Sequence, residues 1–214
     1  MQSMAFRQQL RDGLHEMGIA HSTQQEDKLL AYISLLQKWN TAFNLSGVRD
    51  VQDMLPRHLL DSLSLQTRLS GQRVLDVGTG PGLPGIPLAI WNPDKTFDLL
   101  DSNGKKTRFV FQAVLELGLS NVRVHHKRIE TFNPEADIDV IVSRAFSTLQ
   151  ELVSLTHHLQ ISGHTKIIAM KGQYPQSELD QLPPEVEVIA VEKVVIPGNS
   201  GERHLIELRR NAVG

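Results

Sequence analysis

The chain is organised around the stretch Val74-Leu75-Asp76-Val77-Gly78-Thr79-Gly80-Pro81-Gly82-Leu83-Pro84-Gly85-Ile86-Pro87. Apolar residues around an aspartate, followed by four glycines within eight positions, predict a buried strand that breaks into a tight loop and opens a helix. Because glycine has no Cβ, Gly78, Gly80 and Gly82 can take positive φ and bring a ligand against main-chain N–H groups. The helix expected to begin near Pro84 adds its positive dipole end. The loop is therefore expected to hold an anionic ligand group.

The spacing of the acids around this loop narrows the choice of ligand. The string Gly80-x-Gly82-x-x-Gly85 matches the dinucleotide-binding pattern, but an earlier glycine and an aspartate precede it at the strand end. The order apolar-apolar-Asp-x-Gly-x-Gly-x-Gly resembles the first motif of class I S-adenosylmethionine-dependent methyltransferases. A second acid closes the next apolar run, where such folds place a carboxylate on the ribose hydroxyls of the cofactor. We expect cofactor contacts at Asp76, Gly78, Gly80, Gly82 and Asp101, although each aspartate could instead cap its own turn.

Composition excludes several kinds of chemistry. The 214 residues contain no cysteine, which excludes disulfides, thiolate zinc sites and the thiol adduct of pyrimidine C5 methylation. The net charge of −2 predicts that a nucleic acid meets local basic patches rather than a global field. The first residues contain no apolar leader segment, and no apolar run has membrane-spanning length. We expect a cytoplasmic monomer that does not bind membranes.

Two patterns follow each other along the chain. Residues 1–70 have the apolar spacing of helices, with a capping box at Ser22-x-x-Gln25 or Thr23-x-x-Glu26 and a third helix over Gln52–Leu69. Strand and helix signals alternate over residues 71–214, which predicts a doubly wound α/β sheet with an N-terminal helical extension packed on it. The expected strands are Arg73–Val77, Thr96–Leu100, Val122–His125, Asp139–Ser143, Lys166–Lys171, Glu187–Val194 and His204–Arg209; the expected helices between them are Ile86–Trp91, Lys105–Leu117, Leu149–His158 and Gln176–Gln181.

Charged residues stand at the carboxyl ends of the expected strands, where open α/β sheets bind their ligands. Arg144 ends an apolar strand, so its guanidinium needs a partner, either a neighbouring acid or a ligand. Lys105 begins a helix, where the dipole disfavours cations, so we expect its charge to serve a site. Glu130 is placed for the adenine region. Arg128, the member of His125-His126-Lys127-Arg128 nearest the strand tip, is a candidate substrate contact; adjacent histidines on a strand point apart, and no metal site is expected.

The N-terminal helices contain polar residues in a segment otherwise patterned for burial. Helical spacing puts Arg57 or His58 one turn from Asp61. Two interpretations stay open at this point: a wall of a pocket, or a capping and salt-bridge network that joins the helices to the sheet.

A family resemblance runs from about residue 10 to the C-terminus. The motifs that carry it are Asn44-Leu45, Arg57-His58-x-x-Asp61-Ser62, the stretch Asp76 to Pro87, Leu100-Asp101-Ser102, Ser143-Arg144-Ala145, Lys171-Gly172-Gln173 and Gly201-Glu202-Arg203-His204-Leu205. Together they resemble the glucose-inhibited division protein B family, bacterial methyltransferases that modify guanosine N7 in small-subunit (16S) ribosomal RNA. The resemblance implies a Rossmann-like seven-stranded sheet whose last strand is antiparallel, with helices on both faces. It also implies S-adenosylmethionine as co-substrate and the RNA or a ribosomal particle as partner.

The resemblance further implies roles for individual residues. Cofactor contacts carry over to Gly78, Leu83, Ile129, Glu130 and Arg144. Basic residues around the active site carry over to Lys105, Arg128, Arg144, Lys171 and Arg203.

The implied reaction requires no general base, because guanine N7 has an in-plane lone pair and loses no proton. The fourth strand tip, Ser143-Arg144-Ala145-Phe146, agrees, since it lacks the Asn/Asp-Pro-Pro-aromatic motif of amine methyltransferases. Arginine usually binds guanine through O6 and N7 together, and N7 must stay free here. We therefore expect Arg144 or Arg203 to hold only O6 or a phosphate.

Three other functions remain to be weighed. An NAD-dependent oxidoreductase is disfavoured because Asp76 lies within the strand and the chain has only two tyrosines, with no Tyr-x-x-x-Lys constellation. A methyltransferase of small molecules would have a more apolar pocket and fewer basic strand tips. A non-catalytic nucleotide- or RNA-binding module is disfavoured by the complete set of strand-tip residues.

Overall fold

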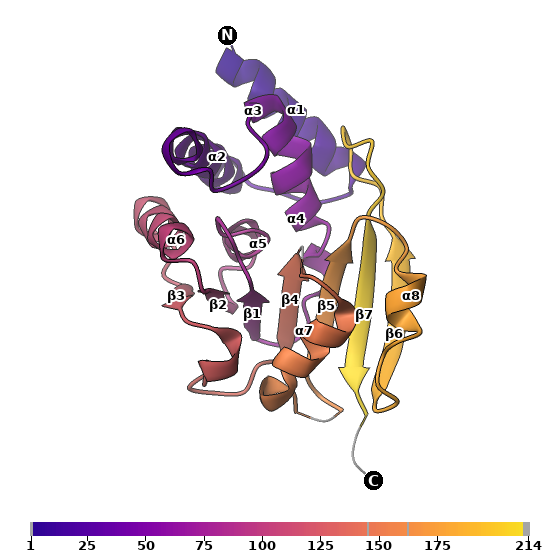
Figure 1. The fold of residues 1–214 in the computed structure, drawn as a ribbon. Coiled ribbons are helices and arrows are strands. Elements are labelled where there is room, and N and C mark those ends of the chain that lie inside the picture. The colour runs from indigo at the N-terminus through magenta and orange to yellow at the C-terminus, as the bar shows by residue number, and fades with distance from the viewer. Residues whose placement is uncertain (1, 145, 162, 212–214) are drawn as a thin grey trace.

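Seven strands form one sheet in the computed structural model, which describes residues 2–144, 146–161 and 163–211 (Figure 1). Their order is β3-β2-β1-β4-β5-β7-β6, and β7 is antiparallel to both of its neighbours while the other pairs are parallel. The predicted strands and the predicted antiparallel last strand are therefore confirmed. Ala145 of the Ser143-Arg144-Ala145 motif lies outside the described residues. The strands are β1 (Arg73–Val77), β2 (Thr96–Asp101), β3 (Val122–His126), β4 (Val140–Arg144), β5 (Lys166–Lys171), β6 (Val186–Lys193) and β7 (His204–Arg210).

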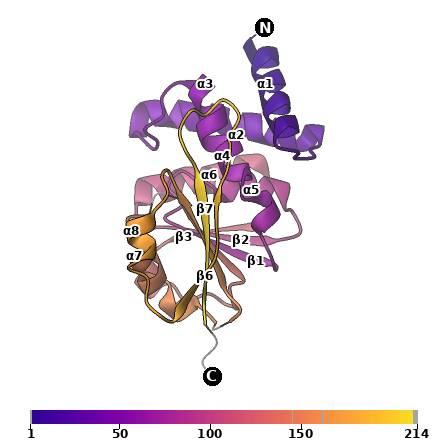
Figure 2. The ribbon, with the colours of Figure 1, turned by 90° about the vertical axis from the view of Figure 1, so that its right-hand side faces the viewer.

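Helices cover both faces of this sheet. Successive strand residues point to opposite faces, and because both sets are apolar here, each face has its own core. In β1, Val74 joins the core shared with α5 (Gly85–Trp91) and α6 (Gly104–Leu117), whereas Leu75 joins the core shared with α7 (Leu149–Leu155). Figure 2 shows α5 on one side of the sheet and α7 with α8 (Gln176–Leu179) on the other. This is the doubly wound architecture that the alternating sequence pattern predicts.

The N-terminal segment packs on the face covered by α5 and α6. Its first two helices are α1 (Gln2–Glu16) and α2 (Thr23–Phe43), and α2 begins with the predicted capping box between Ser22 and Gln25. Leucines of both helices belong to the same apolar core as α5 and α6. One apolar core contains residues from both sides of residue 70. The division of the chain into two domains at this position therefore stays a prediction.

The predicted third helix, Gln52–Leu69, is wrong as one continuous helix. The structure has α3 (Val51–Met54), a π-helical turn over Leu55–Leu60, α4 (Asp61–Leu63) and a 3₁₀ turn over Gln66–Arg68. Proline at position 56 has no backbone N–H, so the regular hydrogen-bond ladder cannot continue through it. The π turn contains His58 and ends at Leu60, directly before Asp61.

Two later helices end earlier than predicted. The helix expected over Leu149–His158 ends at Leu155, and a 3₁₀ turn follows over His157–Leu159. There Thr156 Oγ1 donates to the carbonyl of Leu152 at 2.7 Å, and Gln160 Nε2 donates to the carbonyl of Val153 at 2.9 Å. These side chains donate hydrogen bonds to the last carbonyls of the helix, and such bonds from side chains compete with continuation of the helix. The helix expected over Gln176–Gln181 ends at Leu179.

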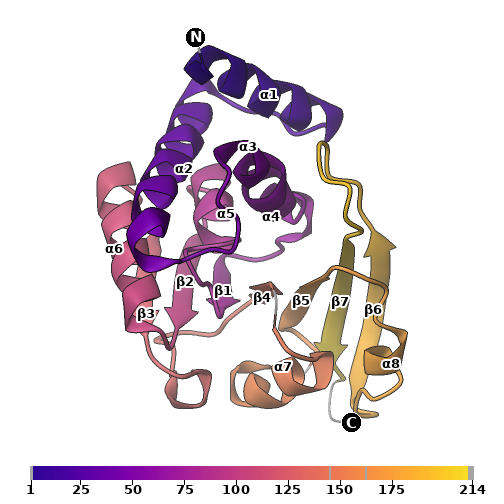
Figure 3. The same cartoon turned by 45° about the horizontal axis from the view of Figure 1, so that its top comes forward.

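The N-terminal helices lie beyond the carboxyl ends of the parallel strands. In Figure 1 the arrowhead of β4 points toward them and that of β7 points away. Figure 3 shows α3 and α4 next to α5, with α2 running along α6. Within the described ranges, no helix combines the length and the apolar character needed to cross a bilayer.

Candidate active site

The glycine loop after β1 has the backbone conformation that its sequence predicts. Gly78, Gly80 and Gly82 have φ values of 69°, 60° and 93°. A Cβ at Gly78 would meet nothing nearer than 3.9 Å, and one at Gly80 nothing nearer than 4.0 Å, so both glycines leave open space beside the loop. A Cβ at Gly82 would lie 2.5 Å from Ile86, so this glycine serves the turn itself.

The N–H groups of the loop are already used by the protein, which corrects the expectation that they receive a ligand anion. The amides of Gly78 and Thr79 donate to the carbonyl of Leu100 at 2.9 and 3.0 Å, and that of Gly82 donates to the carbonyl of Thr79. The amide of Gly80 donates to Asp101 Oδ2 at 2.8 Å. The anions at this loop are therefore the protein's own carboxylates, and the glycines contribute room rather than donors.

Asp76 is the second of these carboxylates. It is fully buried under the loop, where its Oδ2 accepts from Thr79 Oγ1 at 2.6 Å and from the amide of Gly85 at 2.8 Å. Its Oδ1 is buried without a hydrogen-bond partner among the described residues. Burial raises the pKa of Asp76 to about 6, against the lowering effect of these two donors. Asp76 thus holds the loop and caps α5 from beneath.

The opposite wall comes from the N-terminal segment. His58 Nδ1 lies 2.9 Å from the carbonyl of Arg57, which can only accept, so Nδ1 carries the proton. His58 Nε2 then accepts from Ser46 Oγ at 2.7 Å. Burial, followed by the charge of Arg144, lowers the pKa of His58 to about 4, which keeps the imidazole neutral. Tyr32 fastens this segment to the glycine loop by donating to the carbonyl of Pro81 at 2.7 Å.

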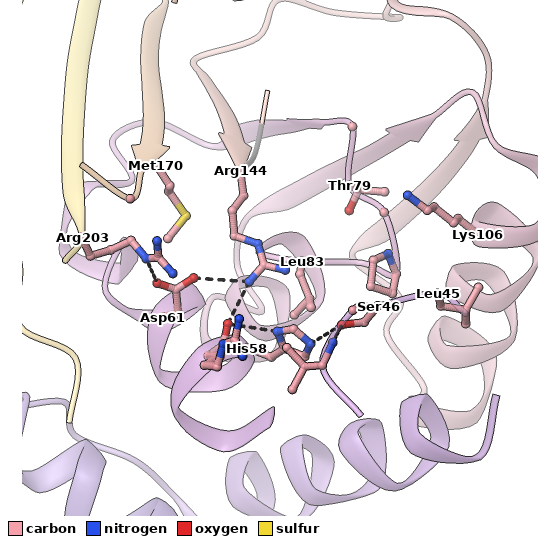
Figure 4. A pocket seen from close by; sticks show the side chains of 17 residues that line it. Leu45, Ser46, His58, Asp61, Thr79, Leu83, Lys106, Arg144, Met170 and Arg203 are labelled. Carbon is pink, nitrogen blue, oxygen red and sulfur yellow. Dashed lines mark hydrogen bonds and ion pairs between the residues drawn. The ribbon is translucent and has the colours of Figure 1, made fainter. Parts of the chain in front are cut away.

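Asp61 joins two arginines that come from distant parts of the chain. Its side chain is fully buried, and Oδ1 accepts from Arg203 Nε at 2.6 Å while Oδ2 lies 3.3 Å from Arg144 Nη1. Arg144 also donates to the carbonyl of Arg57 at 3.1 Å. Figure 4 shows the three side chains meeting at one wall of the pocket. One carboxylate facing two guanidiniums leaves the cluster with a net positive charge.

These walls enclose a cavity of about 530 Å³ at the carboxyl edge of the sheet. The volume lies in the range of small-molecule sites. The cavity brings together five of the sequence-predicted site residues: Gly78, Gly80, Leu83, Arg144 and Arg203. It is also lined by Leu45, Ser46, Gly47, Val48, Arg57, His58, Asp61, Thr79, Pro81, Lys106, Met170 and Gly172.

The other predicted residues lie outside this lining. Asp101 bridges the loops after β1 and β2, accepting from the amides of Gly80 and Asn103. Ile129 is buried in the core on the α7 face, and Glu130 and Arg128 are exposed. Their contacts with cofactor or substrate stay predictions.

Two lysines differ from expectation in where they lie. Lys105, which the sequence assigns to the site, is exposed, whereas its neighbour Lys106 lines the cavity. Lys171 Nζ lies 2.8 Å from Glu178 and 3.3 Å from the carbonyl of Ser147, and its side chain is 12% exposed. In this structure Lys171 therefore holds the loop after β4 against α8. The role around the active site that the family resemblance implies for Lys171 would require this ion pair to open.

Sequence reasoning missed some of the lining. Lys106 is one example, and the other is the loop from Leu45 to Val48, which Asn40 holds by donating to the carbonyl of Val48 and accepting from the amide of Ser46. The sequence signal for the wall formed by the N-terminal segment was the polar run Arg57-His58-x-x-Asp61 in a segment patterned for burial. Both interpretations of that run hold, because these three residues line the cavity and Asp61 also pairs with the sheet.

The opposed pKa shifts of His58 and Asp76 predict a pH dependence that variants can separate. Between pH 7 and pH 5 the unfolded histidine takes up a proton that folded His58 refuses, so acidification favours unfolding. Folded Asp76 takes up a proton before the unfolded aspartate does, so acidification favours folding. Urea unfolding of Asp76→Asn should show a free energy of unfolding that falls by roughly 1 kcal/mol more over this range than in the unmodified protein.

The His58→Gln variant supplies the opposite control. It should lose less stability than the unmodified protein between pH 7 and pH 5, because the group that resists protonation is gone. Equal pH slopes in all three proteins would contradict the assigned shifts.

Comparisons with solved structures agree with the fold. The O-methyltransferase TomG from Streptomyces achromogenes, solved in complex with S-adenosylmethionine, has a TM-score of 0.58 at 15% identity and covers 85% of this chain and 90% of its own. TrmN from Thermus thermophilus has a TM-score of 0.53 at 20% identity over 81% of this chain and 52% of its own. At such identities the likeness shows the fold alone, a Rossmann-like sheet with helices on both faces.

Sequence comparisons are more specific. Two relatives are described as ribosomal RNA small subunit methyltransferase G. The protein from Serratia proteamaculans is 49% identical over 92% of this chain and 96% of its own length. The protein from Laribacter hongkongensis is 50% identical over 96% of this chain and 99% of its own length. The family model described as rRNA small subunit methyltransferase G matches residues 25–206. This chain belongs to that family, GidB, the glucose-inhibited division protein B family that its motifs resemble.

Proposed function

We propose that this protein transfers the methyl group of S-adenosylmethionine to N7 of a guanosine in small-subunit ribosomal RNA, as a monomer in the cytoplasm. As a member of the GidB family the chain is a methyltransferase, with S-adenosylmethionine as its co-substrate. The observation that supports the proposal best is the cavity at the carboxyl edge of the sheet, with the glycine loop on one side and the Asp61-bound arginines on the other.

The residues of this cavity suit the co-substrate. Gly78 and Gly80 offer a surface that a Cβ would fill, and Leu83 adds an apolar contact. Asp101, next to the loop, keeps lone pairs on both oxygens for ribose hydroxyls while it accepts one backbone N–H on each. Bound S-adenosylmethionine supplies an electrophilic methyl group on a sulfonium. We assign its binding to these residues and to Arg144.

The side chains around the cavity suit a nucleophile that needs no deprotonation. His58 is the histidine in the described lining, and both of its ring nitrogens are engaged, one by the carbonyl of Arg57 and one by Ser46. It is therefore unavailable as a general base, and guanine N7 requires none. The positive charge moves from sulfonium to base without a net change, so the site must orient its reactants rather than stabilise a new charge. Such positioning can contribute roughly 7–11 kcal/mol.

Arg144 and Arg203 would orient the guanine. Asp61 holds each guanidinium through one nitrogen, and the side chains are 20% and 23% exposed, so further N–H groups face the cavity. Because N7 must stay free, these groups would bind O6 or a phosphate.

The exposed basic residues around the cavity predict a specific salt dependence. Lys105→Gln and Arg128→Gln should each weaken RNA binding and reduce the slope of log affinity against log salt by about 0.7 to 0.9. Lys171→Gln should leave that slope nearly unchanged, because its ammonium is held by Glu178. Filter binding of small-subunit rRNA between 50 and 300 mM salt measures this slope. If the RNA affinity of the unmodified protein does not change with salt, the proposed phosphate contacts of Lys105 and Arg128 are rejected.

The direct test of the function uses labelled methyl groups. The protein is incubated with S-adenosylmethionine labelled in the methyl group and with small subunits, or their RNA, that lack the modification. Label should enter the RNA at one guanosine, and strand cleavage specific for N7-methylguanine should occur there. Label in protein alone, or in another atom of the RNA, would overturn the proposal.

A further inference from the structure

A second cavity lies where α2, α6 and β3 meet, and it shares no lining residue with the cavity of the glycine loop among the described residues. Figure 3 shows α2 and α6 side by side above the edge strand β3. The volume is about 490 Å³. We call this cavity the α6 groove, lined in part by Trp39, Arg108, Phe111, Gln112, Val124 and His126.

The α6 groove presents one exposed aromatic ring, Phe111, and beside it a second ring, Trp39, that packs against the edge of the apolar core. Phe111 is 57% exposed, although its neighbours Phe109 and Val110 on the same helix are fully buried. Trp39 is half-buried and stays in place because its ring packs against Phe109, with centroids 5.7 Å apart, and against Phe43, 5.4 Å apart. One exposed phenylalanine is unremarkable on a protein surface. Here it lines a cavity together with a fixed tryptophan.

The described lining of the α6 groove contains one arginine as its formal charge, and Glu116 lies at one end, where Gln112 Nε2 donates to its Oε1 at 2.8 Å. Arg108 and His126 line the groove, Lys105 is exposed one turn earlier on α6, and the described lining contains no carboxylate. Neither Lys105 nor Arg108 takes part in any ion pair found within residues 2–144, 146–161 and 163–211. Cations at the beginning of a helix oppose its dipole, so these residues do not stabilise α6. Their placement favours an anionic partner.

We propose that the α6 groove binds an unpaired base of the RNA substrate, stacked on Phe111, with the adjoining phosphates on Arg108 and Lys105. The inference rests on the proposed function and names a second contact of the same RNA. Aromatic faces next to guanidinium groups are the surfaces on which proteins hold single-stranded RNA. The same helix presents Lys106 to the catalytic cavity, roughly 7.5 Å along its axis from Phe111. RNA that enters the cavity therefore meets the groove beside it.

Intrinsic fluorescence tests the groove without catalysis. The chain has two tryptophans, Trp39 in the groove and Trp91, which is buried. Titration with a single-stranded uridine decamer should quench the Trp39 signal saturably, and Phe111→Ala should weaken this binding roughly tenfold. Phe111→Trp should retain the affinity, measured by anisotropy of the labelled decamer. Arg108→Gln should weaken it more than Arg123→Gln, which removes an equal charge from an exposed pair on β3.

The matched control for Phe111 is Leu115→Ala. Leu115 is 60% exposed, lies one turn further along α6 and does not line the groove, so its replacement should leave RNA affinity unchanged. In methyl transfer to naked small-subunit rRNA, Phe111→Ala should raise KM for the RNA roughly tenfold with kcat and S-adenosylmethionine affinity unchanged.

Each alternative outcome is distinguishable. If Phe111→Ala changes neither the decamer affinity nor KM by more than twofold, the proposal is overturned. A KM effect with ribosomal particles but not with naked RNA would assign the groove to a ribosomal protein and overturn it as well. If the unmodified protein binds the decamer through Phe111 but methylates no small-subunit rRNA, the proposed function fails while the groove stands.

Discussion

Replacement of Asp61 by asparagine is expected to lower methyl transfer at saturating substrates roughly 100-fold. The amide keeps the shape of the side chain but removes the charge that holds Arg144 and Arg203 at one wall of the cavity. The two guanidiniums then repel each other, and a displacement of about 1 Å at a reacting centre can account for a loss of this size. Binding of S-adenosylmethionine, measured by calorimetry, should fall far less than the rate.

Asp61→Asn should lower the free energy of unfolding as well as the rate of methyl transfer. A second buried aspartate outside the cavity therefore serves as a control that separates the two effects. Breaking this ion pair should cost roughly 3 kcal/mol, the low end for buried pairs, because both arginines keep contact with solvent. Asp98 is equally buried and bridges Arg73 and His125 at 2.9 and 2.7 Å, away from the cavity lining. Asp98→Asn should lower stability and leave the transfer rate of the folded protein unchanged. Equal rate losses in both variants would reduce Asp61 to a structural residue.

Replacement of Gly80 by leucine is expected to lower the affinity for S-adenosylmethionine roughly 100-fold, a loss of about 2.7 kcal/mol of binding free energy. A side chain at this position would point into open space next to the loop, because its Cβ would meet nothing nearer than 4.0 Å. The fold should tolerate the change at a cost of roughly 1–2 kcal/mol for the left-handed backbone at φ 60°. Calorimetric titration with S-adenosylmethionine measures the loss.

Gly118 provides a control with the same backbone strain. It ends α6 with φ 60°, and a Cβ there would also meet nothing within 4 Å, but it lies outside the lining of the cavity. Gly118→Leu should therefore lose a similar amount of stability and bind S-adenosylmethionine normally. If both variants bind it normally, the glycine loop is not the surface that receives the co-substrate.

Local chemistry made much of the fold predictable from the sequence. The run of glycines after an apolar strand predicted a tight loop, and the structure confirms positive φ at Gly78, Gly80 and Gly82. Alternating strand and helix signals predicted seven strands whose ends lie within one residue of the observed ones. The break at Pro56 was less accessible, because a proline near a helix start is compatible with both a regular first turn and the observed π turn.

The candidate site was only partly predictable because its contacts join distant residues. Spacing suggested that Asp61 meets a residue one turn away, whereas its partners are 83 and 142 positions further along the chain. The choice between Lys105 and Lys106 depends on how α6 is rotated about its axis, which the sequence of one helix does not specify. The amides of the glycine loop were expected to face a ligand anion. Those of Gly78 and Thr79 instead donate to the carbonyl of Leu100 on β2, and those of Gly80 and Gly85 donate to aspartates at the ends of β2 and β1. Such pairings are decided by tertiary packing.

The central claim is that the cavity between the glycine loop and the N-terminal segment receives a sulfonium methyl donor. Titration calorimetry of the unmodified protein with S-adenosylmethionine, and separately with NAD, tests it most directly. The account predicts saturable heat with one S-adenosylmethionine per chain and none with NAD. Saturable binding of NAD with no heat from S-adenosylmethionine would contradict it.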